Sequence, residues 1–364
     1  MTTRSFRPLS RRCSKGLLFE GALIDYAVWQ MGRDDGRKDW RRHMRAMQVT
    51  QLGQPLEMRE VDRPVAAAGE VLVRIQTCGL NFGDTLIVKG TYQEKPQLPA
   101  TIGMEMCGIV EAVGAGVTHL KPGQRVAAYA GFGGLGEYAA LPASICVPIP
   151  DAMTAVEAAA FLVAYGTSHV ALDYKAHLRS GERLLVLGAS GGVGLTAVEL
   201  GKLMGAEVIA CARGAKKLAV ARDAGADHLL DSETVDLRAE VKALGGADVV
   251  YDPVGGELFD AALRACNPEA RLLPLGFASG KVPQIPSNIL LVKNLTVIGY
   301  YWGGYTRVNP QVLTDSFKVL FDWYEKGKLR PHVSHVLPLS QANAGLELLR
   351  SRQATGKVVI QVDA

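Results

Sequence analysis

Hydrophobic and polar positions follow different patterns in the first and second parts of the chain. Up to about residue 150, short segments alternate between apolar and polar residues and are separated by glycine and proline, which is typical of strands. The clearest of these segments are 71–76, 107–113 and 125–129. They predict a compact, mostly β first domain.

Beyond this domain, strands alternate with helices. A helix is expected from Thr154 to Phe161, because Thr154 and Glu157 have the spacing of a capping box. The expected later strands are 184–187, 208–211, 228–230, 248–251, 271–275 and 295–298, with helices such as 192–204 and 216–224 between them. Six strands with intervening helices predict an α/β fold with a parallel, doubly wound sheet of the Rossmann type. Helices at 312–326 and 341–350 follow, and a last strand at 356–361 is expected to return to the first domain.

One glycine-rich segment carries the strongest functional signal. The apolar strand 184–187 runs directly into glycines and then into a helix. Glycines allow a tight turn and a close approach of the backbone to a pyrophosphate, and the start of the helix offers free N–H groups. We therefore predict a dinucleotide site. Its expected contacts are Gly188, Ser190, Gly191, Gly192, Val193 and Gly194.

The next strand indicates which dinucleotide is bound. NAD enzymes place Asp or Glu about 20 residues further on, where it holds the ribose 2′-hydroxyl. Here the strand is followed by Arg213, Lys216 and Lys217 instead. Cations favour a 2′-phosphate, so we predict NADPH as the cofactor. One of the two lysines is expected to be a surface charge, and Arg213 and Lys217 are the preferred ligands.

Charge and composition narrow the possible functions. The chain has 364 residues, enough for two domains. Residues 1–45 contain eleven Lys and Arg and five Asp and Glu, whereas the remainder contains 29 and 31 and is nearly neutral, which gives no support for nucleic-acid binding. The six cysteines are scattered, and no apolar run is long enough to span a membrane. We expect a cytoplasmic protein without nucleic-acid or membrane partners.

The basic excess lies in residues 1–45. A bias toward Arg without acidic residues before Glu20 is shared by mitochondrial presequences, and an extension upstream of a start at Met44 or Met47 is the other interpretation. We favour the extension. In either case residues 1–45 are expected to be mostly disordered or loosely helical and are excluded from the fold.

Several motifs together resemble the quinone-reductase branch of the medium-chain dehydrogenase/reductase superfamily over residues 46–364. They are Asn81-Phe82-Gly83-Asp84, Gly90-Thr91-Tyr92, Gly103–Val110, Tyr165-Gly166-Thr167, Gly188–Gly194, Asp252–Gly256 and Thr355-Gly356-Lys357. The resemblance implies a GroES-like β-rich substrate domain at 46–165, completed by 301–364, and a Rossmann domain at 166–300. It also implies an active site between the domains and a homodimer with strand 295–298 at the contact.

The superfamily includes zinc alcohol dehydrogenases. The residues at the zinc-ligand positions of those enzymes therefore indicate whether this chain can bind zinc. In those enzymes a cysteine ligand stands where this chain has Asn81, and a histidine ligand stands where it has Met104. The short segment 131–136 replaces the lobe that holds structural zinc. Asn81 and Met104 cannot replace cysteine and histidine as zinc ligands. We therefore predict no metal, and a structural role for Glu105.

Without a metal, an electron-poor acceptor is expected because it needs less polarisation. The predicted reaction is hydride transfer from NADPH to a quinone or another conjugated carbonyl compound. The resemblance makes Tyr92 and Asn81 the hydrogen-bond donors to the acceptor oxygen. Asp84 is expected to orient its neighbours or to cap a helix. Thr167 and Phe277 are added as cofactor contacts.

Two departures from the family's residue pattern and two alternative functions stay open. Leu86 stands where relatives often have an aromatic residue, and Asp231 stands where they often have a tyrosine that contacts phosphate. Asp231 would repel a nearby 2′-phosphate unless Arg213 compensates. An enoyl-thioester reductase is the first alternative, although the sequence shows no extra basic entrance for it. The second is a non-catalytic NADPH-binding protein with a structural or RNA-binding role. The aromatic stretch 300–305 is expected to be buried between the domains rather than to line the cleft.

Overall fold

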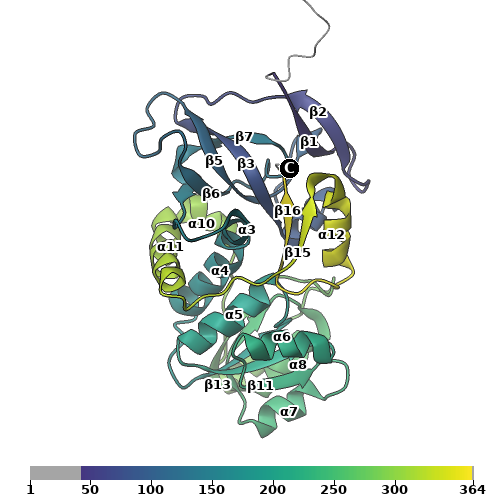
Figure 1. Ribbon diagram of the computed structural model, residues 1–364. Coiled ribbons are helices and arrows are strands. Elements are labelled where there is room, and N and C mark those ends of the chain that lie inside the picture. Colours follow the sequence, from purple (N-terminus) through teal and green to yellow (C-terminus); the bar gives the residue numbers. More distant parts are fainter. Residues whose placement is uncertain (1–41, 363–364) are drawn as a thin grey trace, which may run out of the picture. The chain divides into compact units, whose positions relative to one another are not determined.

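The computed structural model describes residues 42–362 (Figure 1). The expectations about residues 1–41 therefore lie outside the described residues. Strand β1 (His43–Val49) begins at His43, before residue 46, where the fold was expected to start. Met44 is buried in this strand, and the backbone N–H of Arg45 donates to the Glu137 carboxylate at 2.7 Å. Because of these contacts, β1 includes His43 and Arg45. The sequence had assigned both residues to the basic N-terminal extension 1–45.

The β-rich part contains a seven-stranded sheet in the order β15-β16-β3-β5-β6-β8, with β7 also paired to β3, and a three-stranded sheet β2-β1-β4. The final strand β16 pairs antiparallel with β3, so the end of the chain returns to this part, as the sequence predicts (Figure 1). The strands are β2 (Glu57–Asp62), β3 (Glu70–Leu80), β4 (Ala100–Thr101), β5 (Glu105–Val113), β6 (Arg125–Tyr129), β7 (Tyr138–Pro142), β8 (Cys146–Pro148), β15 (Val333–Pro338) and β16 (Lys357–Gln361).

The second sheet is the predicted parallel one. Its six strands have the order β11-β10-β9-β12-β13-β14, and each neighbouring pair is parallel. The strand order reverses between β9 and β12, which is the point where a doubly wound sheet binds a dinucleotide. The strands are β9 (Arg183–Leu187), β10 (Glu207–Ala212), β11 (His228–Asp231), β12 (Ala247–Asp252), β13 (Cys266–Pro274) and β14 (Thr296–Val297).

Helices cover both faces of this sheet, because successive side chains of a strand point to opposite sides. Leu184 and Val186 contribute to a core with residues of α4, α5 and α11, whereas Leu185 and Leu187 contribute to a core with residues of α7 and α8. The helices are α2 (Phe82–Lys89), α3 (Ala155–Ala159), α4 (Leu162–His169), α5 (Gly192–Leu203), α6 (Ala215–Asp223), α7 (Leu237–Ala243), α8 (Gly256–Ala265), α9 (Ser287–Lys293), α10 (Tyr305–Val308), α11 (Pro310–Glu325) and α12 (Ala342–Arg350). Two-sided burial explains why these strands are continuously apolar.

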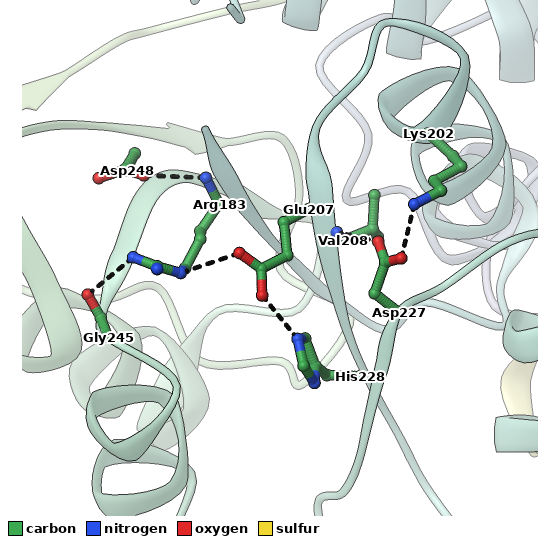
Figure 2. A network of polar contacts seen from close by, with 8 residues as sticks. All are labelled: Arg183, Lys202, Glu207, Val208, Asp227, His228, Gly245 and Asp248. Carbon is green, nitrogen blue, oxygen red and sulfur yellow. Dashed lines mark hydrogen bonds and ion pairs between the residues drawn. The ribbon is translucent and has the colours of Figure 1, made fainter. Parts of the chain in front are cut away.

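A polar network links the starts of β9, β10 and β11 (Figure 2). Arg183 Nε donates to Glu207 Oε2 at 3.0 Å, and the other oxygen of Glu207 lies 2.7 Å from His228 Nε2. The backbone N–H of Arg183 donates to Asp248 at 2.8 Å, which adds β12 to the network. These contacts lie at the edge opposite to the glycine turn, so they support the sheet and leave its carboxyl edge for binding.

The two sheets share one hydrophobic core. Cys107 of β5, Ala127 of β6 and Val359 of β16 belong to the same buried cluster as Leu184 and Val186 of the parallel sheet. The expected domain boundary at residue 165 falls inside α4. This helix packs against α5 of the parallel sheet, so a single helix connects the β-rich part to the Rossmann part.

Candidate functional site

The glycine turn follows β9 as predicted. Gly188 has a φ of +62°, a conformation that favours glycine, and the N–H of Gly191 donates to its carbonyl at 2.9 Å. A side-chain carbon added at Gly194 would lie 2.2 Å from the Gly188 carbonyl oxygen, so the helix approaches the strand too closely for any other residue. Helix α5 begins at Gly192 and directs the N–H groups of its first turn toward this edge.

The turn is held by the last strand of the chain. The N–H of Gly356 donates to the Ser190 carbonyl at 2.8 Å, and Gly191 and Gly356 form an isolated parallel bridge. Lys357, the next residue, is the first residue of β16, and its side chain extends toward Asn81 and Glu105 of the β-rich part. The same short segment therefore touches both the predicted cofactor turn and the predicted substrate residues.

Lys357 and Glu105 form a buried ion pair at this junction. The ammonium of Lys357 lies 2.9 Å from Glu105 Oε2 and donates to Asn81 Oδ1 at 2.7 Å, and the side chains of Lys357 and Glu105 are 5% and 0% exposed. Glu105 Oε1 also accepts from the backbone N–H of Val163 at 2.8 Å. These bonds give Glu105 the structural role expected from the sequence. In the sequence, Lys357 is marked only as the last residue of the motif Thr355-Gly356-Lys357.

The side-chain amide of Asn81 is fully engaged in this network. Its Nδ2 donates to the Gly79 carbonyl and to Glu105 Oε2, each at 3.2 Å, while its Oδ1 accepts from Lys357. Both N–H groups of the Asn81 amide are therefore engaged within the protein, and its donation to an acceptor stays a prediction. In this arrangement its amide connects the buried ion pair to the loop before α2.

Asp84 lies in the first turn of α2 and is fully buried. Its Oδ2 accepts from the backbone N–H of Asn81 at 2.8 Å, which fits the expected capping and orienting role. Burial raises the pKa of Asp84 from 3.8 to about 7. Its second oxygen, Oδ1, is buried and has no hydrogen-bond partner among residues 42–362.

Three tyrosines, Tyr92, Tyr129 and Tyr301, form a cluster near Asp84, and we call it the tyrosine cluster. The Tyr301 hydroxyl donates to Glu94 Oε1 at 3.0 Å. A side-chain carbon added at Gly303 would lie 2.5 Å from the Tyr129 hydroxyl and 3.1 Å from the Tyr301 hydroxyl, so both hydroxyls approach the same glycine. Burial raises the pKa of both Tyr92 and Tyr129. Of these three tyrosines, only Tyr92 is a predicted site residue.

The aromatic stretch after β14 connects this cluster to α4. Trp302 packs edge-on against Tyr129 with a centroid distance of 4.9 Å, and a side-chain carbon added at Gly166 would lie 2.9 Å from the indole. The Tyr300 hydroxyl donates to the carbonyl of Thr167 at 3.2 Å. The stretch thus lies at the junction of the two parts, as expected, and it places the tyrosine cluster beside the predicted cofactor contact Thr167.

The predicted cations gather beyond the end of β10, together with one more. Lys217 Nζ donates to the backbone carbonyl of Arg352 at 2.5 Å. Partial burial lowers the pKa of Lys217, and the nearby charges of Arg213 and Arg352 lower it further. Arg352, two residues beyond the end of α12, was missed because only the fold brings it to this place. The three residues form a cation cluster suited to a phosphate group.

Two acidic residues accompany this cation cluster. Arg213 pairs with Glu233 at 3.1 Å on the surface, and the Asp231 carboxylate accepts from the backbone N–H of Gly214 at 3.0 Å. Backbone hydrogen bonds lower the pKa of Asp231. Asp231 is therefore still expected to repel a nearby 2′-phosphate, although its carboxylate is hydrogen-bonded to the loop before α6. A phosphate would have to compete with Glu233 for Arg213.

The remaining predicted contact, Phe277, lies at the same carboxyl edge of the sheet. A side-chain carbon added at Gly255 would lie 3.2 Å from its ring, and the residue is 43% exposed. A pocket of about 630 Å³ also reaches the turn from the side of α5 and α6, with Gly192 and Lys357 among its lining residues. This pocket gives a ligand access to the start of α5 from that side.

No three or more His, Cys, Asp or Glu side chains within residues 42–362 are arranged to hold a metal ion. None of the helices in this part of the chain is long and apolar enough to cross a membrane. The strand order, the glycine turn and a β-rich part that contributes buried polar residues define a two-part oxidoreductase of the dinucleotide-binding class.

Comparisons with known proteins agree with this class. Residues 67–151 match the family model described as alcohol dehydrogenase GroES-like domain, and residues 192–318 match the one described as zinc-binding dehydrogenase. A quinone oxidoreductase-like protein 2 homolog of Nematostella vectensis is 36% identical over 98% of this chain and 96% of its own length. The chain belongs to the quinone oxidoreductase family of the medium-chain dehydrogenase/reductase superfamily.

Solved structures show the same relationship. The quinone oxidoreductase of Thermus thermophilus, described also as its complex with NADPH, is 33% identical, with a TM-score of 0.78 over 88% of this chain and 100% of its own. The Escherichia coli quinone oxidoreductase complexed with NADPH is 29% identical, with a TM-score of 0.81 over 88% of this chain and 99% of its own. The predicted α/β architecture is therefore confirmed.

Proposed function

We propose that this protein binds NADPH and transfers hydride, without zinc, to quinones or other conjugated carbonyl compounds. The observation that carries the proposal is the position of the Lys357 ammonium, which bonds to Asn81 and Glu105 at the junction of the two parts. A protein cation there supplies the positive charge that compensates Glu105, which supports a site that works without a metal ion.

NADPH is supported by the fit of the residues to its two phosphate groups. The glycine turn and the start of α5 offer N–H groups to the pyrophosphate, and Gly194 allows the required close approach. Arg213, Lys217 and Arg352 would hold the 2′-phosphate. When bound, the nicotinamide supplies the hydride, and the solved relatives complexed with NADPH support the same cofactor.

The proposed acceptor class rests on Asn81 and Met104, which occupy the positions of the catalytic zinc ligands of related dehydrogenases and are not zinc ligands themselves. Alcohol oxidation needs a group that lowers the alcohol pKa, which zinc provides in other members of the superfamily. A quinone or enone is already electron-poor and needs mainly orientation and a hydrogen bond to the oxygen that gains charge. Tyr92 remains the proposed hydrogen-bond donor to the acceptor oxygen. It belongs to the tyrosine cluster, which lies beside Trp302 and Thr167. Asn81 is proposed to position Lys357 rather than to contact the acceptor.

An acceptor panel tests this function. NADPH oxidation by the full chain is measured with 1,4-benzoquinone, 9,10-phenanthrenequinone, a small enone and crotonyl-CoA, with NADH in parallel. Turnover with the quinones or the enone, and preference for NADPH, are expected. Turnover with crotonyl-CoA alone would support the enoyl-thioester reductase and contradict the proposal, and tight NADPH binding without turnover would indicate a non-catalytic protein.

A homodimer is the proposed assembly. Strand β14 is the last strand of the parallel sheet and pairs only with β13 among the described strands, so its other edge can accept a partner. Helix α9 precedes it and presents Leu291 and Val292, each 77% exposed. Exposed apolar side chains beside an open sheet edge are typical of a protein interface.

A further inference from the structure

The loop between α2 and β4, residues 91–99, carries Tyr92, the proposed donor to the acceptor oxygen. We call it the acceptor loop. The N–H groups of Thr91 and Tyr92 donate to the Leu86 carbonyl at 2.9 and 3.3 Å, which fixes the start of the loop to α2. Beyond Tyr92, Glu94 is the one residue of this loop that forms hydrogen bonds or an ion pair within residues 42–362. The polar contacts of the rest of the loop are therefore those of a single carboxylate.

The Glu94 carboxylate is shared by two side chains from one distant segment. Its Oε1 accepts from the Tyr301 hydroxyl at 3.0 Å and from Arg307 Nη2 at 3.2 Å. The bond from Arg307 joins two opposite charges and is therefore stronger than a bond between neutral groups. The Glu94 side chain is 28% exposed, so solvent screens this pair less than a fully exposed one. The other oxygen, Oε2, lies 3.6 Å from the place where a side-chain carbon at Gly131 would stand.

Tyr301 is held in place by the tight turn that follows it. The N–H of Gly304 donates to the Tyr301 carbonyl at 3.1 Å, and a side-chain carbon added at Gly304 would lie 2.9 Å from the Tyr301 ring. The hydroxyl of Thr306 donates to the Gly303 carbonyl at 2.8 Å, which closes the same turn. Glycine therefore leaves space for the ring against the turn, and the ring directs its hydroxyl toward Glu94.

The segment that carries Tyr301 is also fixed to the cofactor side of the site. The neighbouring Tyr300 hydroxyl donates to the carbonyl of Thr167, a predicted cofactor contact, at 3.2 Å. On the other side of Tyr301, the Trp302 indole packs against Gly166 so closely that a side-chain carbon there would lie 2.9 Å from it. A bond to Tyr301 therefore connects the acceptor loop to the residues beside the predicted cofactor.

We infer that Glu94 is a positioning residue, which fixes the acceptor loop relative to the cofactor by bonding to Tyr301 and Arg307. This inference rests on the proposed function and deepens it. Hydride transfer needs reacting atoms about 3–3.5 Å apart, so an acceptor that is bound by Tyr92 reacts only while the loop keeps this position. Glu94 acts through Tyr92 and does not itself contact the acceptor.

Kinetics with 9,10-phenanthrenequinone test this role. Glu94→Ala removes both bonds and is expected to lower kcat/KM for the quinone by about tenfold or more, the factor typical of a lost hydrogen bond to a charged group. The KM for NADPH should stay within about twofold, because the glycine turn and the cation cluster are unchanged. Glu94→Gln keeps an oxygen that accepts from Tyr301, so it should lose less activity than Glu94→Ala. Lys95→Ala, a change at the exposed neighbour in the same loop, is the matched control and should equal the wild type.

The dependence on Tyr92 distinguishes positioning from a general loss of structure. In a Tyr92→Phe protein the hydroxyl that Glu94 positions is missing. Adding Glu94→Ala to that protein should therefore lower kcat/KM for the quinone by no more than about twofold further. Losses from the two changes that multiply in the double variant would overturn the inference, as would full activity of Tyr92→Phe.

A second measurement needs no cofactor. Chymotrypsin cleaves after Tyr92 only in molecules whose acceptor loop has opened, so the rate of this cleavage reports the open fraction of the loop. Mass spectrometry of the fragments identifies the cleaved bond. Glu94→Ala should be cleaved there about tenfold faster than the wild type, since the lost bonds favour opening by that factor. Tyr301→Phe should lie between the two, and Lys95→Ala should equal the wild type. An unchanged cleavage rate in Glu94→Ala would show that Glu94 does not hold the loop.

The two measurements separate the inference from the proposed function. A wild-type protein that reduces no acceptor with NADPH would refute the proposed function and the catalytic part of the inference, while the cleavage rates would still show whether Glu94 holds the loop. A wild type that turns over while Glu94→Ala keeps its full kcat/KM for the quinone would refute only the positioning role.

Discussion

The ammonium of Lys357 lies 2.7 Å from Asn81 Oδ1, although the two residues are 276 positions apart in the chain. Gly356, the residue before Lys357, bonds to Ser190 in the glycine turn. The start of β16 therefore couples the predicted cofactor turn to the loop before α2. A change at Lys357 is expected to affect stability and both halves of the site.

Replacing Lys357 with methionine should destabilise the protein. The change would leave the Glu105 carboxylate buried without its cation, which costs about 3–5 kcal/mol in comparable buried pairs. The free energy of unfolding, measured by denaturant titration, should fall by about this amount. In the double variant Lys357→Met with Glu105→Gln, no buried charge is left unpaired, so part of the stability should return. A double variant less stable than Lys357→Met would show that the pair is not coupled.

Replacing Asp84 with asparagine should change how stability depends on pH. The pKa of Asp84 is raised to about 7, so the folded protein keeps a proton that the unfolded chain releases above about pH 4. The wild type therefore loses stability from this group as pH rises toward 7. Between about pH 5 and pH 8 the variant should gain about 3 kcal/mol of unfolding free energy relative to wild type.

Asp151→Asn, a change at an exposed residue, serves as the control for this pH experiment and should run parallel to the wild type. The titration of Asp252, which is also buried, is common to all three proteins and cancels in the comparison. Parallel stability curves for Asp84→Asn and wild type would contradict the raised pKa.

Replacing Arg352 with alanine should weaken the preference for NADPH. The residue lies beside Lys217 in the cation cluster, and a hydrogen bond to a charged group contributes about 1.5–3 kcal/mol. The kcat/KM for NADPH should fall by about tenfold or more, while that for NADH changes little. Lys216→Ala, a change at the exposed neighbour of Lys217, is the control. Equal losses with both cofactors would remove Arg352 from the 2′-phosphate site.

Replacing Val292 with glutamate should disrupt the proposed dimer. The side chain is 77% exposed on α9, and burial of a carboxylate in an apolar interface is costly. Analytical ultracentrifugation should show a shift from dimer to monomer. Val308→Glu, at an 81% exposed position on α10, should leave the dimer intact. A dimeric Val292→Glu protein would place the interface elsewhere.

Local patterns predicted the parts of the structure that depend on neighbouring residues. The strands of the parallel sheet are buried on both faces, so their apolar runs are visible in the sequence, and the turn after β9 is marked by glycines that only this geometry requires. The start of β1 was missed because His43 and Arg45 resemble the basic extension. Their strand conformation depends on pairing with β2 and on Glu137.

Contacts between distant segments could not be predicted in the same way. Tyr301 and Glu94 are 207 positions apart, and Arg352 meets Lys217 over 135 positions. Nothing in the local sequence of these residues distinguishes them from ordinary surface side chains. The contacts of Asn81 could not be predicted for the same reason, because its amide partners Lys357 and Glu105 come from β16 and β5.

Hydride transfer without a metal is tested by measuring zinc content and activity on the same sample. The full chain, treated with a chelator, is analysed for zinc by mass spectrometry and then assayed for NADPH oxidation with 9,10-phenanthrenequinone. Protein that contains essentially no zinc should be fully active. Activity that is lost with the chelator and restored by one zinc ion per chain would contradict this expectation.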